Sequence, residues 1–273
     1  MNAPAWLDEL SLGAGPPWHA MGTRALDEGE WLLPPDVDAR EQLHLKRNLL
    51  DTAAEVVSAT CHSAGAEDAV QEAAELVAAA TGLPLEGGRP PLAAAALLVQ
   101  EDLCVLVDHD GRWRLEAGVV CFPSMWRLSD KIGLPITAIH EPVPMYAEEL
   151  ATRVDRFVDR LRVDRPVWRR NWLVHDSPEL HLPQPPPPSP RPVRIPEDLW
   201  LRSERQTLRR LPRTDAVVFT IRTQQAPLAV VAERRDIAAA MAAAIEAWSP
   251  DLVSYRRAEA WRVAVVAWLT KAG

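Results

Sequence analysis

The sequence predicts an α+β fold, an antiparallel sheet packed by helices on one side, with helical extensions at both ends of the chain. Apolar residues recur at helical spacing in the first third and near the C-terminus. Between these regions they alternate or form short β-branched runs, and long excursions separate the strand candidates. The chain has 273 residues, 48% of them hydrophobic, which is enough to bury a substantial core.

The first third is expected to be helical after an N-terminal arm. Residues 1–36 are rich in Pro, Gly and Trp, which favours an ordered arm over a helix. Leucine and valine recur every three or four residues over 41–58. A second helix is predicted over 67–80, because Gly82 closes it and Pro84 stands beyond.

The middle of the chain changes to strand periodicity. An apolar run at 103–107, the turn pair at 110–111 and alternation over 113–119 predict a β-hairpin. A short helix is then expected over 126–132 and a brief strand over 136–139.

His140 is expected in an extended segment, because Pro142 and Pro144 disfavour helix at the residues before them. A helix over 145–162 follows, with one apolar stripe, and a strand is predicted over 168–174.

The last third begins with a proline-rich loop at 183–196, which is typical of a stiff spacer. Strands are predicted at 199–206 and 216–223 and helices at 229–248 and 252–271. We therefore divide the chain into the arm and a single domain over 37–273.

Charge and cysteine content restrict the function. A net charge of −8 argues against general binding to nucleic acid backbones. Three cysteines without a CxxC pair indicate a reducing compartment. The N-terminus lacks the pattern of a signal peptide, and no apolar run is long enough to span a membrane, so a cytoplasmic protein is expected. Fifteen of the arginines fall over 153–222, a positive segment suited to an anionic ligand or an acidic partner.

Motifs for built-in redox cofactors are missing from the sequence. It contains no GxGxxG after a strand, no GxxxxGK[ST], no HExxH and no GxSxG. An oxidoreductase made from this chain must therefore receive its electrons from another protein.

Two groups of residues are candidates for chemistry. His140 is a candidate iron ligand, because neutral imidazole binds iron well, although a half-buried structural histidine is the alternative. As a strand, 202–207 would point Arg202, Glu204 and Gln206 to one face and Ser203, Arg205 and Thr207 to the other. With Arg222 on the next strand, this pattern indicates either an anion clamp beside a carboxylate for a cationic substrate or a structural ion pair.

Eight segments together are similar to one family. They are AMGTRALD at 20–27, QEDL at 100–103, CFPSMW at 121–126, KIG at 131–133, IHEPVP at 139–144, NW at 171–172, RSERQTLRRLP at 202–212 and VVFTIRT at 217–223. In this order they resemble the haem-dependent oxidative N-demethylase alpha subunits. Met145, Asp215 and Gln224 depart from the family's pattern.

The resemblance implies a PAS-like α+β fold that binds haem b and acts as an iron-dependent monooxygenase. Such an enzyme uses O2 to demethylate a small secondary amine, such as dimethylamine, and releases formaldehyde. Electrons from NADPH arrive through a partner flavin and iron–sulfur reductase. A PAS-like haem sensor or carrier without catalysis is the alternative, and a non-haem interaction protein is a third hypothesis.

On this sequence the resemblance assigns His140 as the haem ligand and Arg205, Arg222 and Lys131 as partners of the haem propionates. Glu204 is expected to hold the protonated amine, with a cation–π contact from Trp126 or Trp172. Neither nucleic acid nor a membrane is expected as a partner.

Overall fold

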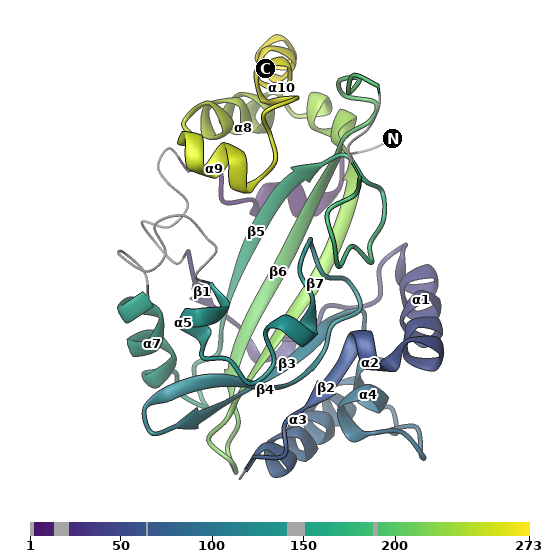
Figure 1. The fold of residues 1–273 in the computed structure, drawn as a ribbon, viewed down its shortest axis with the longest axis vertical. Helices are drawn as coiled ribbons and strands as arrows, with labels where there is room; N and C mark the ends of the chain where they lie inside the picture. Colours follow the sequence, from purple (N-terminus) through teal and green to yellow (C-terminus); the bar gives the residue numbers. More distant parts are fainter. Residues whose placement is uncertain (1–2, 14–21, 64, 141–150, 188–190) are drawn as a thin grey trace.

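A seven-stranded sheet organises the fold, with strand order β1-β5-β6-β7-β3-β4-β2 (Figure 1). The computed structural model describes residues 3–13, 22–63, 65–140, 151–187 and 191–273. All the strand pairings within the sheet are antiparallel. The structure is thus a mixed α+β fold with an antiparallel sheet, as the sequence predicts.

Three long strands form one half of the sheet and a hairpin the other. The long strands are β5 (Val167–His175), β6 (Trp200–Arg210) and β7 (Val217–Pro227). The hairpin is β3 (Asp102–His109) with β4 (Arg112–Val119), and the short edge strands are β1 (Arg24–Ala25) and β2 (Ser58–Thr60). The predicted hairpin and the three later strands are confirmed.

Helices from both ends of the chain cover one face of this sheet. Those before β3 are α1 (Ala39–Thr52), α2 (Ala54–Val57), α3 (Ala66–Thr81) and α4 (Pro91–Ala96). Those after β7 are η4 (Leu228–Glu233), α8 (Arg235–Glu246), α9 (Pro250–Tyr255) and α10 (Arg262–Ala272). The arm, with η1 (Ala5–Glu9) and η2 (Glu28–Glu30), lies on this same face, which we name the arm face.

The opposite face, which we name the histidine face, carries α5 (Ile136–Ile139) and α7 (Ala151–Asp159). These helices and η3 (Leu128–Asp130) pack on the hairpin half and leave the long strands in view in Figure 1. Helices therefore lie on both faces, which corrects the expectation of helices on one side.

The structure also corrects several local predictions. The segment 136–139 is a helix rather than a strand, because Pro135 supplies an N-terminal start and the Pro135 carbonyl accepts from the Ile139 amide. His140 closes this helix with φ −99° and ψ 0°, so it is not extended. The helix expected over 126–132 shortens to η3, and each of the two C-terminal helices is interrupted. Pro142, Pro144 and positions 145–150 lie outside the described residues.

Turn residues adopt the conformations that their chemistry favours. Asp110 and Gly111, between β3 and β4, have φ of 55° and 79°, the left-handed values of a tight hairpin turn. Asp215 has φ 58° before β7, and Asp tolerates this region better than most residues. Among the described residues, no helix combines the length and apolarity needed to cross a membrane.

The C-terminal helices are held to the sheet by a buried apolar cluster, and this packing predicts a stability difference. Met241 of α8 is fully buried in the cluster with Leu201 and Leu228, whereas Val263 of α10 is 77% exposed. Met241→Ala is expected to lower the free energy of unfolding by about 2–5 kcal/mol. Val263→Ala should stay within about 0.5 kcal/mol of wild type. Urea unfolding measures both, and equal losses would contradict the packing described.

Candidate functional site

His140, Lys131 and Trp126 gather on the histidine face beside α5. The Lys131 ammonium donates to the Ile139 carbonyl at 2.8 Å and lies 5.3 Å from the centre of the Trp126 ring. Burial lowers the pKa of Lys131, and the neighbouring Asp130 carboxylate partly opposes this effect. Three of the residues expected in the site are thus brought together by one short stretch of chain.

The His140 ring is held in one tautomer. Its Nδ1 lies 2.8 Å from the Ile136 carbonyl oxygen, and because a carbonyl only accepts, Nδ1 carries the hydrogen. Burial lowers the pKa of His140, the bond to Ile136 partly raises it, and the charges of Lys131 and Arg169 lower it again. The lone pair of the neutral ring is therefore on Nε2, the tautomer that metal-binding histidines often use.

Glu204 lies on the same face of the sheet, on β6. Gln206 donates to one Glu204 carboxylate oxygen at 3.1 Å, and the other oxygen lies 3.7 Å from Nε of Arg202. These contacts confirm the predicted alternation along 202–207. Arg169 on β5 is the cross-strand partner of Gln206, so Glu204 lies one two-residue step, roughly 7 Å, along β6 from the residue that pairs with Arg169.

The histidine face is partly exposed along the central strands. Arg169, Asn171, Gln206, Leu208 and Phe219 all point to this face and are intermediate in exposure, although β6 and β7 lie inside the sheet. Leu208 and Phe219 also pack against the apolar cluster beneath α5 and α7. This face therefore offers an apolar floor next to cationic and carboxylate side chains.

The arm face carries a row of buried arginines. Arg170, Arg205 and Arg222 are direct cross-strand partners on β5, β6 and β7, and all three are at least 96% buried. Glu101, just before β3, is the next residue of the row and lies 3.3 Å from Arg222. Arg170 binds Glu9 of the arm at 2.6 Å, so the row is covered by the chain's own N-terminal segment.

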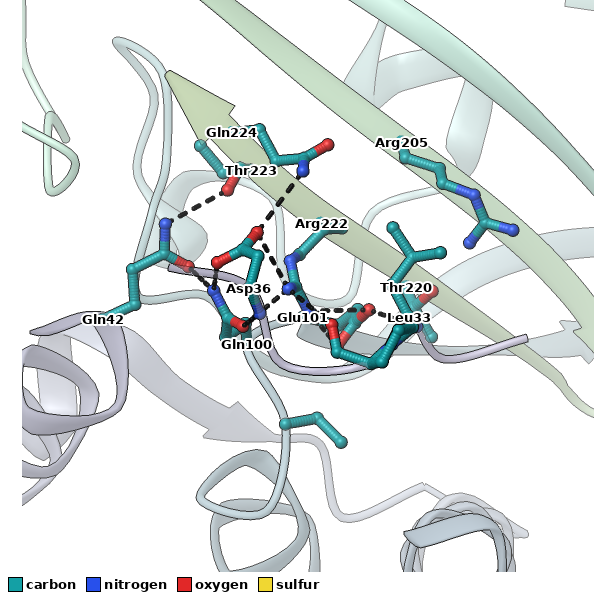
Figure 2. A network of polar contacts seen from close by, with 12 residues as sticks. Leu33, Asp36, Gln42, Gln100, Glu101, Arg205, Thr220, Arg222, Thr223 and Gln224 are labelled. Atoms are coloured by element: carbon teal, nitrogen blue, oxygen red, sulfur yellow. Dashed lines mark hydrogen bonds and ion pairs between the residues drawn. The ribbon is translucent and has the colours of Figure 1, made fainter. Parts of the chain in front are cut away.

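Arg222 is the most extensively paired member of the row. Figure 2 shows Asp36, Gln100 and Glu101 around its guanidinium. Asp36 lies 3.0 Å from Nη2, and the Gln100 side-chain oxygen accepts from the same nitrogen at 2.5 Å. Arg222 is therefore part of a structural ion-pair network, one of the two alternatives that the sequence leaves open.

Arg205 and Trp172 are also committed to the arm face. Arg205 donates to the carbonyls of Glu30 and Trp31, and the Trp172 indole donates to the Ser11 carbonyl at 3.1 Å. The structure thus places Arg205, Arg222 and Trp172 on one face and His140, Lys131, Trp126 and Glu204 on the other. It does not bring the two sets into one site.

Arg169 is a charged neighbour of His140 that sequence reasoning missed. It faces His140 from β5 and is near enough for its charge to lower the pKa of that histidine. The alternation along 168–174 contains the signal that identifies Arg169. Odd-numbered residues of this strand point to the histidine face, and even-numbered residues point to the arm face. Gln224, near the end of β7, lies on the arm face, where it donates to Asp36 and accepts from Arg170.

A simple metal site is not evident. Within the described ranges, no three His, Cys, Asp or Glu side chains form a group that could hold a metal ion.

The arm network predicts a pH dependence of stability. Burial raises the pKa of Asp36, but hydrogen bonds from Gln100 and Arg222 and the Arg222 charge outweigh it, so its pKa lies below 3.8. The folded state then binds fewer protons than the unfolded state, and the stabilisation is present above pH 3.8 and lost as pH falls through the folded pKa. The stability advantage of wild type over Asp36→Asn should therefore shrink between about pH 5 and pH 2.

Asp38 is the matched control, since burial and the charges of Asp36 and Glu41 raise its pKa. Its ionisation opposes folding, so the free energy of unfolding of Asp38→Asn should rise slightly relative to wild type above pH 3.8. Urea unfolding across this pH range measures both differences, and the same pH dependence in both variants would refute the role of Arg222.

Residues 79–266 match the model of one family, described as "Haem-dependent oxidative N-demethylase, alpha subunit-like". The match spans strands β3 to β7 and both faces of the sheet, including Lys131, His140, Arg169 and Glu204. The chain therefore belongs to the haem-dependent oxidative N-demethylase alpha subunit-like family.

Proposed function

We propose that the chain is a haem-binding, PAS-like subunit that oxidatively demethylates a small secondary amine. Family membership supports the haem and the reaction class. The observation that carries the proposal is the His140 ring, whose Nδ1 is fixed by the Ile136 carbonyl so that Nε2 holds the lone pair.

The residues of the histidine face fit a haem. His140 supplies a neutral imidazole for the iron, and Leu208 and Phe219 supply apolar contact for the macrocycle. Lys131 and Arg169, both electrostatic neighbours of His140, are the cations we assign to the propionates. The resemblance also assigns Arg205 and Arg222 to the propionates. Both contact the arm, and Arg222 also contacts Glu101 and Gln100, so they would bind a haem only after releasing these contacts.

We assign the amine to the Glu204 carboxylate, with Trp126 as the aromatic neighbour on the same face. A carboxylate holds a protonated amine by charge and hydrogen bonds, and an indole face adds a cation–π contact. Trp172 is less suited, because its ring stacks on Arg256 and Trp248 in the core of the arm face.

When bound, the haem activates dioxygen, and the protein's residues bind and orient the amine. In the net reaction, R–NH–CH3, O2, two electrons and two protons give R–NH2, formaldehyde and water. The electrons come from NADPH through a separate flavin and iron–sulfur reductase. The motifs for such cofactors are absent from this sequence, which accords with a partner reductase.

The absorption spectrum of the hemin-titrated protein, before and after dithionite, tests the haem and its ligand. Wild type should show a Soret band, and His140→Ala should lose or shift it. His181→Ala is the matched control, because the His181 ring makes the same kind of bond, at 2.8 Å to the Cys121 carbonyl. Its spectrum should equal wild type.

Three outcomes would each contradict part of the proposal. A band lost in His175→Ala but kept in His140→Ala would move the ligand to β5. No band in wild type would remove the haem function altogether. A Soret band without amine turnover, measured with a surrogate reductase, would favour the alternative of a haem sensor or carrier.

A further inference from the structure

The helix that carries His140 is too short to hold its own position. α5 has four residues, Ile136–Ile139, and an isolated helix of this length is not stable in water. Its first end is anchored to β4, because Pro135 forms a β-bridge with Arg114 and the Arg114 guanidinium donates to the Gly133 carbonyl at 3.1 Å. The orientation of His140 therefore also depends on what holds the last end of α5.

Lys131 holds that last end. Its ammonium donates at 2.8 Å to the Ile139 carbonyl, which belongs to the peptide unit that joins Ile139 to His140. At the other end of the same peptide unit, the His140 amide donates to the Ile136 carbonyl at 3.3 Å. The last carbonyls of a helix lack partners within the helix, and a lysine side chain is one of the groups that can satisfy them. The bond therefore fixes the backbone from which the His140 ring projects.

The ring and the backbone of His140 share one acceptor. The Ile136 carbonyl also accepts from Nδ1 of the ring, at 2.8 Å. A rotation of the peptide unit between Ile139 and His140 would disturb both bonds, and the ring would lose the contact that fixes its tautomer. Lys131 therefore acts on the direction of the Nε2 lone pair through the Ile139 carbonyl.

The Lys131 ammonium is itself held in place. It lies 5.3 Å from the centre of the Trp126 ring, and the Lys131 amide donates to the Leu128 carbonyl at 2.9 Å. The side chain is partly buried, where an ammonium needs partners to offset the loss of water. An ammonium has three N–H donors and the Ile139 carbonyl uses one, so this role is compatible with a propionate contact.

We propose that Lys131 is a positioning residue for the haem ligand, which it holds through the Ile139 carbonyl while Trp126 supports its ammonium. This inference rests on the proposed function for the identity of His140 as the ligand. It goes beyond the propionate role, because it predicts an effect of Lys131 on the bond between His140 and the iron.

Two porphyrins that differ only in iron test this role. Hemin dimethyl ester and protoporphyrin IX dimethyl ester both lack the propionate charges, so neither reports on a salt bridge to Lys131. Lys131→Met keeps the apolar stem and removes the ammonium. We expect it to weaken binding of the iron ester by about tenfold, as loss of the groups that support a metal ligand does, and to leave binding of the iron-free ester unchanged. Soret titration of the iron ester and fluorescence titration of the iron-free ester measure these affinities.

Two further variants complete the test. Lys271→Met, at an exposed lysine of α10, is the matched control and should bind both esters as wild type does. Trp126→Leu removes the support of the Lys131 ammonium and should weaken the iron ester by about two- to fivefold, as expected for loss of a cation–π contact.

The melting temperature of each variant shows whether it is folded, and if Lys131→Met does not fold, the comparison of the two esters in Trp126→Leu decides. Unchanged affinity of a folded Lys131→Met for the iron ester overturns the proposal. An equal loss for both esters also overturns it, because the effect would then lie in the shape of the porphyrin pocket.

Amide hydrogen exchange of the haem-free protein separates this inference from the proposed function. The His140 amide should exchange about tenfold faster in Lys131→Met than in wild type, because opening of α5 no longer breaks a bond to a charged group. Faster exchange in a protein that takes up no haem supports the hold of Lys131 on His140 and rejects the haem function. A Soret band in wild type, with unchanged exchange and unchanged ester affinity in Lys131→Met, rejects the positioning role and keeps the haem.

Discussion

The arginine row on the arm face is the constraint on which the rest of the structure depends. Three guanidiniums lie side by side on neighbouring strands, nearly free of solvent, where unpaired charges would cost several kcal/mol each. Glu9, Asp36 and Glu101 supply the opposite charges, and Glu30 and Trp31 supply carbonyls. Two of these carboxylates belong to residues 1–36. The arm therefore stabilises the sheet by pairing with its buried guanidiniums, and the sheet in turn holds the arm.

This requirement also determines which face of the sheet is available for chemistry. Successive side chains of a strand point to opposite faces, so a strand that buries Arg205 against the arm must present Glu204 and Gln206 to the histidine face. The same holds on β5, where Arg170 faces the arm and Arg169 faces His140. The dense cluster of arginines thus serves two purposes, structural pairing on one face and a cationic surface on the other.

The sequence predicts this alternation correctly but not the partners of each residue. Local patterns are sufficient for the hairpin, the three long strands and the two faces of 202–207, because period and turn chemistry are local properties. The pairing of Arg222 with Asp36, 186 positions away, depends on how the arm crosses the sheet, and no spacing rule encodes it. The prediction of a strand over 136–139 is wrong for a related reason. Four residues are too few to distinguish a helix from a strand by periodicity.

The buried charges also explain how the side chains on the partly exposed histidine face keep their positions. A slip of one residue in the β5–β6 register would exchange the two faces, carrying Arg205 away from the arm and Glu204 into it. The arm offers carboxylates and carbonyls, which suit a guanidinium and repel a carboxylate, so such a slip would leave charges buried without partners. The register is therefore fixed by electrostatics as well as by apolar packing. Glu204, Arg202 and Arg169 are then held at defined positions on the histidine face before any ligand binds, which is the preorganisation that selective binding of a small molecule requires.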